Sequence, residues 1–343
     1  MINKHSIYNW LFFPLLALML AGSAASCIND PTMEEEDTSG KTTLSITVRG
    51  VTTTNGSSDE YIKTLRIIGF DETGTVVCNE LHFGTDFDIE NDALNITQTM
   101  EEAFQGGVCD FYFIANEGMY IVYSDNNELT TFLNGVSKTN LEDCIIATPS
   151  NQPFTPSETT PILMTTSVRT TLRPGDNTIN NIELVRCFAK VQLKIIDKTN
   201  SANVGSNLVL KGTYPGYYSL WDESQEANWT SNDTSVNIDL DLEQGTIEQD
   251  GQSYDLYTSQ EIYFPERLFT PDANIEVNAL KFSFTLNDKP YTAAVADAAG
   301  KDFNIRRNTH YTVIATLKKK ETVTFNVMVN AWGEKTMVVP AFE

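Results

Sequence analysis

The chain has 343 residues, and its 46 acidic side chains outnumber its 23 lysines and arginines, which gives a formal net charge of −23 at pH 7. A field of this sign keeps a protein soluble and disfavours binding to nucleic acid and to anionic membrane surfaces, so we expect no nucleic-acid partner. The length is sufficient for two domains of ordinary size.

The first 26 residues have the three-part layout of a secretory signal peptide. Lys4 lies in a short basic region, residues 10–21 are apolar, and small residues lead to Cys27. The apolar run is too short for a membrane helix, which needs roughly 20 residues to cross a hydrocarbon core of about 30 Å. Residues 24–27 (AASC) resemble a lipobox, in which the cysteine thiol takes a diacylglycerol and becomes the new N-terminus. We expect lipidation at Cys27, and an ordinary signal peptide cut after an alanine is the alternative.

Residues 28–40 are polar, acidic and free of any hydrophobic period, which predicts a flexible tether. The acidic run at 34–37 (EEED) resembles the surface-export signal of some anaerobic Gram-negative lipoproteins. A solvated linker explains the same residues.

From Lys41 onward the apolar residues alternate with period 2, which indicates β-strands. Leu44, Ile46 and Val48 share one face of the first strand, and a second strand at 62–70 ends in a turn at 71–74. Further strand-like runs lie at 108–118, 177–185, 187–197, 235–242, 275–288, 310–319 and 322–332. Only residues 126–143 look helical, with a short turn around 93–104. The pattern predicts an all-β protein of two β-sandwich domains with a minor helical insertion.

The predicted domains are an N-terminal β-sandwich at 41–184 and a C-terminal β-sandwich at 185–343. The boundary is placed where a new series of strands begins, near 184–187.

The remaining cysteines are Cys78, Cys109, Cys144 and Cys187, and none belongs to a CxxC motif. They allow two disulfides in an oxidising compartment, with no connectivity fixed by their spacing. Cys109 and Cys187 lie inside apolar runs, where we expect buried free thiols.

No motif of catalytic or metal-binding chemistry is present in the sequence. HExxH, a histidine pair at helical spacing, GxSxG and a phosphate-binding glycine loop are all missing. We therefore expect no enzymatic activity, no metal and no cofactor. Tyr217, Trp221 and Trp229 lie in an aromatic segment that suits a sugar-stacking platform, although buried anchors of a loop are the more common use of such residues.

The end of the chain resembles a known family. Residues 308–311 (NTHY) fit an Asn-x-x-Tyr turn that starts a strand, and a later strand ends in Trp332. This ending resembles the closing signature of the fimbrillins, which are the type V pilins and their Mfa-like relatives. Weaker matches follow the family's order, namely the lipobox and the segments at 43–50, 62–74, 111–118, 186–195 and 263–268.

The resemblance implies two sandwich domains of transthyretin type and an outer-membrane lipoprotein precursor, with lipid such as palmitate on Cys27. It further implies that a trypsin-like protease cuts after an arginine that follows the first strand, here between Arg49 and Gly50. A strand of the next subunit would then fill the groove, and the donor implied is the C-terminal segment 322–342. Its alternating side chains are Val323, Phe325, Val327 and Val329.

The expected function is that of a stalk or tip subunit of a cell-surface fimbrium that polymerises head to tail and supports adhesion to a host or bacterial surface ligand. Arg49 has a second explanation, as a charge that ends an edge strand and discourages aggregation. Two alternatives stay open. One is a membrane-retained anchor subunit of the same family, and the other is a monomeric surface glycan-binding lipoprotein that uses Tyr217, Trp221 and Trp229.

Overall fold

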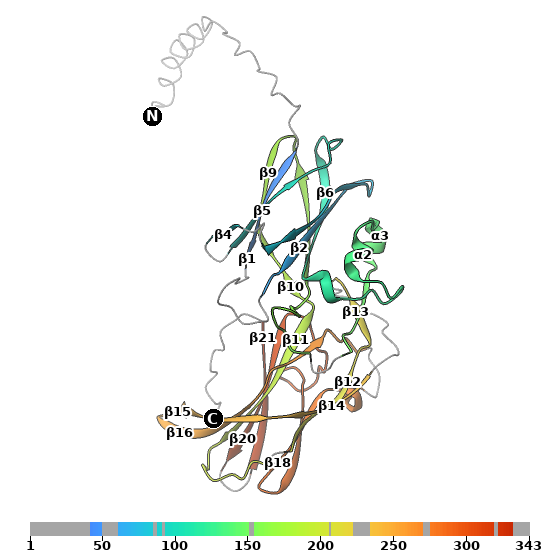
Figure 1. Ribbon diagram of the computed structural model, residues 1–343. Coiled ribbons are helices and arrows are strands. Elements are labelled where there is room, and N and C mark those ends of the chain that lie inside the picture. The colour runs from blue at the N-terminus through green and yellow to red at the C-terminus, as the bar shows by residue number, and fades with distance from the viewer. Residues whose placement is uncertain are drawn as a thin grey trace, which may run out of the picture. The chain divides into compact units, whose positions relative to one another are not determined.

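A computed structural model describes residues 42–49, 61–84, 88–90, 93–150, 154–205, 207–221, 234–269, 275–318 and 322–331. These residues are mostly in β-strands, which confirms the predicted all-β class (Figure 1). They belong to one compact unit that begins at Lys41. The predicted signal peptide, Cys27, the tether, Gly50, Trp229 and Trp332 lie outside the described residues.

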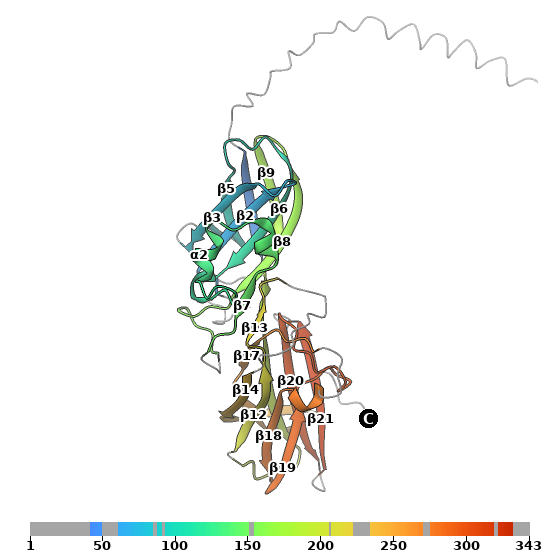
Figure 2. The ribbon, with the colours of Figure 1, turned by 90° about the vertical axis from the view of Figure 1, so that its right-hand side faces the viewer.

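Two sheets enclose the first hydrophobic core, with strand orders β4-β5-β1-β9 and β10-β8-β6-β2-β3 (Figure 2). The strands of the first sheet are β1 (Thr43–Arg49), β4 (Asp88–Glu90), β5 (Ala93–Thr99) and β9 (Asp176–Glu183). Those of the second are β2 (Thr64–Asp71), β3 (Val76–Phe83), β6 (Gly107–Ala115), β8 (Met164–Leu172) and β10 (Val185–Arg186). Side chains from both sheets meet in this core, as in a β-sandwich.

Two further sheets enclose the second hydrophobic core, with orders β15-β16-β11-β20-β21 and β14-β12-β18-β19. The strands of the former are β11 (Phe188–Asp197), β15 (Leu242–Gln249), β16 (Gln252–Ser259), β20 (Thr309–Lys318) and β21 (Thr322–Ala331), and β17 (Ile262–Pro265) also pairs with β11. The latter contains β12 (Leu208–Tyr214), β14 (Thr234–Leu240), β18 (Lys281–Leu286) and β19 (Lys289–Ala294). The strict alternation of buried residues along β18 is what one buried sheet face requires.

The predicted helical stretch at 126–143 contains two short helices, α2 (Leu129–Leu133) and α3 (Lys138–Glu142). They lie beside the sheet that contains β2 and β6 (Figure 1). A 3₁₀ turn, η2 (Glu117–Met119), precedes the two helices. The short strand β7 (Ile145–Ala147) follows them and pairs with β13 (Tyr217–Ser219).

Strand β2 is buried along almost its whole length because both of its faces are covered. Arg66, on the face toward η2, donates from Nε and Nη2 to the two carboxylate oxygens of Glu117, each at 2.8 Å. Its Nη1 donates to Asn79 Oδ1 at 2.9 Å, and Asn79 in turn donates to the Leu133 carbonyl of α2. A buried charge is stable when it is paired and its remaining hydrogen bonds are made, and Arg66 meets both conditions.

Two expectations about local structure are wrong. Residues 93–104 were expected to form a turn, and Ala93–Thr99 instead form β5. The strand-like run at 275–288 begins with a helical turn, α4 (Ile275–Asn278), and only Lys281–Leu286 form a strand.

The division between the two predicted domains at 184/185 stays a prediction. In the structure β10 still pairs with β8 of the first core, and β11, which begins two residues later, enters the second.

Candidate functional site

Strand β1 occupies a central place in its sheet. It pairs antiparallel with β5 and parallel with β9, and a bulge interrupts the second pairing between Ile46 and Val48. The side chains of Leu44, Ile46 and Val48 are at most 1% exposed. Removal of this one strand would leave an open slot between β5 and β9.

The walls of this slot are apolar. Ile46 lies opposite Ile96 of β5 and Ile179 of β9, and Val48 lies opposite Leu94 and Ile182 in the same way. Burying each of the three β1 side chains is worth roughly 1.5–3 kcal/mol, so an empty slot would favour a new apolar strand.

Polar side chains on β1 are also bonded to both walls. Thr43 Oγ1 donates to Asp176 Oδ1 of β9 at 2.5 Å, and Thr47 Oγ1 donates to Asn95 Oδ1 of β5 at 2.9 Å. These wall residues were not singled out from the sequence, because strand pairing between distant segments leaves no local signal.

Arg49 is the last residue of β1 and lies opposite Ala93 on one side and Glu183 on the other. Since β1 has a neighbour on each side, the explanation of Arg49 as a charge on an edge strand does not hold. Cleavage after Arg49 stays a prediction, with Gly50 outside the described residues.

Strand β21 differs from β1 in its position in the sheet and in its burial, the two properties that decide how easily a strand detaches. Among the described strands it pairs only with β20, at the edge of its sheet, and each of its ten residues is at least partly exposed. Val323 and Val327 pack against the second core, whereas Phe325 and Val329 are 39% and 40% exposed. The Phe325 ring lies 6.3 Å from that of Phe284 and 6.4 Å from that of Tyr291. Because β21 is held mainly by one ladder of main-chain hydrogen bonds, it costs less to detach than a buried strand.

The aromatic segment has a structural role where it is described. Trp221 is half-buried, donates from Nε1 to the Leu141 carbonyl of α3 at 2.6 Å, and meets the Tyr112 ring edge-on. Tyr217 packs on Tyr123, with ring centroids 4.3 Å apart. A sugar platform needs open ring faces, and the contacts of Trp221 instead link α3 to the first core. Glycan contact by Tyr217, Trp221 and Trp229 stays a prediction.

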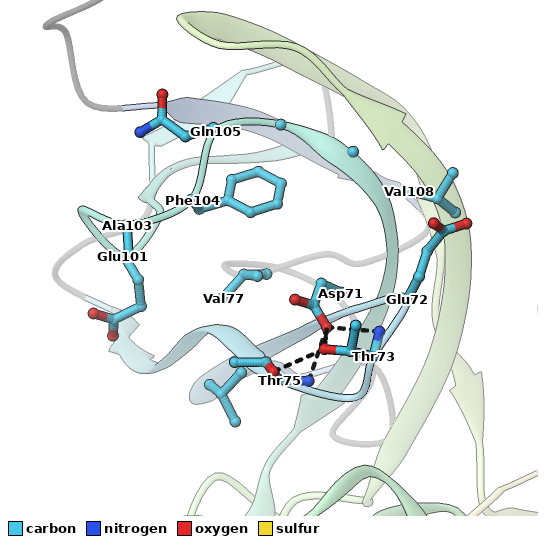
Figure 3. A pocket seen from close by; sticks show the side chains of 13 residues that line it. Asp71, Glu72, Thr73, Thr75, Val77, Glu101, Ala103, Phe104, Gln105 and Val108 are labelled. Atoms are coloured by element: carbon cyan, nitrogen blue, oxygen red, sulfur yellow. Dashed lines mark hydrogen bonds between the residues drawn. The ribbon is translucent and has the colours of Figure 1, made fainter.

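Figure 3 shows a pocket between the turn that joins β2 to β3 and the segment that joins β5 to β6. This pocket lies close to the start of β1. The Thr42 carbonyl, just before β1, accepts a hydrogen bond from the Met100 amide, and the next residue, Glu101, lines the pocket. The other wall is the turn between β2 and β3, which includes Asp71 and Glu72. Hydrogen bonds from the hydroxyl of Thr73 and from the Thr75 amide lower the pKa of Asp71, so this carboxyl is ionised at neutral pH.

The described residues hold no group of three or more His, Cys, Asp or Glu side chains that could bind a metal ion. Cys78, Cys109, Cys144 and Cys187 are buried thiols, as expected for Cys109 and Cys187. None of the helices in the described ranges is long and apolar enough to cross a membrane.

Residues 41–240 match the family model of the major fimbrial subunit protein (FimA). The chain belongs to this fimbrial subunit family. It is accordingly a structural protein of the cell-surface fimbrium and not an enzyme, and its partners are other fimbrial subunits. The family that the sequence resemblance to the fimbrillins implied is confirmed.

Solved structures show the same fold. The tip fimbrial protein Mfa3 from Porphyromonas gingivalis, with a C-terminal truncation, is 15% identical with a TM-score of 0.57, and the match covers 85% of this chain and 100% of that chain. A fimbrial assembly protein from Parabacteroides distasonis is 12% identical with a TM-score of 0.53, and the match covers 85% and 99% of the two chains. No curated protein matches the sequence.

Proposed function

We propose that this fimbrial subunit is a stalk or tip component, made as a lipoprotein precursor and assembled by exchange of its first strand. The precursor would carry lipid on Cys27 at the outer membrane. A trypsin-like protease would then cut after Arg49 and release β1. The adhesion ligand would be a host or bacterial surface molecule.

The central place of β1 between β5 and β9 carries this proposal. A strand with three fully buried side chains and two hydrogen-bonded neighbours leaves a slot that only another strand can fill completely. Strand β21 combines an edge position and partial exposure with alternating apolar side chains, Val323, Phe325, Val327 and Val329, and this combination makes it the best donor among the described strands.

The test is brief treatment of lipid-free protein, beginning at Ile28, with an arginine-specific protease. N-terminal sequencing and size-exclusion chromatography follow. We expect a dominant new N-terminus at Gly50 and head-to-tail oligomers, whereas the variant Arg49→Gln should stay uncut and monomeric. A protected Arg49 in a wild-type protein that stays monomeric would instead support an anchor subunit or a stand-alone binding protein. The mass of the N-terminal peptide of membrane-extracted protein tests the lipid on Cys27.

A further inference from the structure

The segments that contain β1 and the start of β21 have matching sequences. Residues 41–48 read KTTLSITV, and residues 320–327 read KETVTFNV. Aligned without a gap, the two segments share lysine, threonine and valine at the first, third and last positions. At each of the remaining five positions both residues are polar or both are apolar. In this alignment Val323 takes the place of Leu44, Phe325 that of Ile46, and Val327 that of Val48.

The polar partners of β1 also suit the aligned residues of β21. Thr322 replaces Thr43 and can donate the same hydroxyl hydrogen bond to Asp176. Asn326 replaces Thr47, and its side-chain amide can donate to Asn95 Oδ1. The volume lost where valine replaces Leu44 is offset by the larger phenylalanine two residues further on.

The alignment places a run of lysines at the mouth of the slot. Lys318, Lys319 and Lys320 are the only three consecutive basic residues in the chain, and the last of them is the first residue of the aligned segment. With Val323 at the position of Leu44, this run extends past the position of Thr42. That is the end of the slot where Met100 bonds to Thr42 and the pocket begins.

The pocket at this end has the chemistry that lysine requires. Asp71, Glu72 and Glu101 are among its 13 lining residues, and none of the 13 is basic (Figure 3). Arg169 approaches Glu72 at 4.0 Å, but both side chains are more than half exposed, so this pair is weak. Phe104 and Val77 supply apolar surface beside the carboxylates. A lysine can pack its aliphatic stem on such a surface and place its ammonium group among the acids.

The strand directions favour a donor from another molecule. Strand β11 begins two residues after β10 ends, and β20 runs parallel to β11, so Lys318 lies at the end of its sheet remote from β10. The mouth of the slot, where Thr43 pairs with Asp176, is likewise the end of β9 remote from β10.

We propose that β21 of a second copy of this chain enters the slot in the direction and register of β1, with its lysine run docked at the acidic pocket. This inference rests on the proposed strand exchange. It adds the register and an electrostatic contact that selects the correct end of the slot.

The electrostatic contact is tested by charge reversal. Protein beginning at Ile28 is cut with the arginine-specific protease, and the rate of oligomer formation is followed by size-exclusion chromatography at low salt. We expect the pocket variant Glu72→Lys/Glu101→Lys and the donor variant Lys319→Glu/Lys320→Glu each to assemble at least about tenfold more slowly than wild type. In an equimolar mixture the donor strand of each variant is complementary to the pocket of the other, so the mixture should assemble into oligomers in which the two variants alternate. A chain with all four changes should recover most of the wild-type rate. Equal thermal midpoints of the uncut variants check that they fold.

The register is tested by disulfide trapping after cleavage. Asn326→Cys should cross-link to Asn95→Cys in a mixture of the two variants, and only weakly to Thr97→Cys, which lies on the same face two residues away. Equal assembly rates for the charge variants, or equal cross-linking at both positions, would overturn this inference and leave strand exchange standing. Wild-type protein that forms no oligomers after cleavage would overturn both.

Discussion

At the scale of single residues, two aspartates close the turns that follow β2 and β11. Asp71 Oδ1 accepts from the Thr73 hydroxyl and from the Thr73 and Thr75 amides. Asp197 Oδ1 accepts from Thr199, and its Oδ2 accepts from the amides of Ser201 and Ala202. Such bonds replace the water that a carboxylate would otherwise bind, so these turns need an ionised aspartate.

We expect Asp197→Asn to reduce the free energy of unfolding by about 1–3 kcal/mol at pH 7, because the asparagine NH₂ would face two amide donors. Burial alone would raise the pKa of Asp197, but the hydrogen bonds from Thr199, Ala202 and Ser201 outweigh it and lower the pKa below its ordinary value of 3.8. The stabilisation is therefore complete above pH 3.8 and is lost as pH falls through the lower folded-state pKa.

Urea unfolding of both proteins between pH 7 and pH 2.5 measures this effect. The difference between wild type and variant should shrink below pH 3.8. Asp239→Asn, on the exposed face of β14, is the control and should change the stability by less than about 0.5 kcal/mol. A difference that is constant with pH would mean that the charge of Asp197 is not what stabilises the turn. The sequence predicts the first turn from its Asp and Gly, whereas the closure of the second by Asp197 depends on amides up to five residues away.

At the scale of strands, the alternation that predicts β1 and β21 does not reveal how differently the two are held. Val48 is completely buried, and Val327 is half-buried at the edge of its sheet. We expect Val48→Ala to cost about 2 kcal/mol of unfolding free energy and Val327→Ala less than about 1 kcal/mol. Urea unfolding of the uncut protein, followed by circular dichroism, compares this matched pair. Equal losses would show that β21 is as firmly packed as β1.

Strand β5 shows why part of the slot could not be predicted. Leu94, Ile96, Gln98 and Met100 all point into the first core, so a polar side chain interrupts the apolar series. Gln98 is 1% exposed, and its Oε1 lies 2.9 Å from His82 Nε2. Its Nε2 donates to a carboxylate oxygen of Glu80 and to the Thr99 carbonyl. A buried glutamine with its bonds satisfied is compatible with a strand, but in a sequence it looks like a break in the pattern.

At the scale of the whole molecule, one arginine joins the two cores. Arg307 precedes β20 and donates to Glu266 at 2.8 Å, to the Ser219 carbonyl at 2.9 Å and to the Leu220 carbonyl at 3.3 Å. Leu220 belongs to the first core, while β20 contributes to the second. The family resemblance drew attention to residues 308–311, directly after Arg307, as a turn before a strand, and the structure adds this link, which spacing alone does not reveal.

We expect Arg307→Met to remove about 3 kcal/mol of stability, because it leaves the Glu266 carboxylate and two carbonyls without this donor. Calorimetry should show one unfolding transition for wild type and two for the variant, since each core would then unfold on its own. The adjacent Arg306 is exposed and pairs with Asp302, so Arg306→Met is the control. This variant should unfold in a single transition, as wild type does. A single transition in both variants would show that other contacts couple the cores.

The four buried thiols give the protein built-in reporters of its own opening. Burial raises the pKa of Cys78 and of Cys144 to about 12 and that of Cys109 to about 11, so almost no reactive thiolate exists while the structure is closed. Cys78 lies on β3, Cys109 on β6, Cys144 beyond α3, and Cys187 between β10 and β11. The order in which an alkylating reagent marks these positions therefore records which region opens first, in purified subunits or on the bacterial surface, with no engineered cysteine.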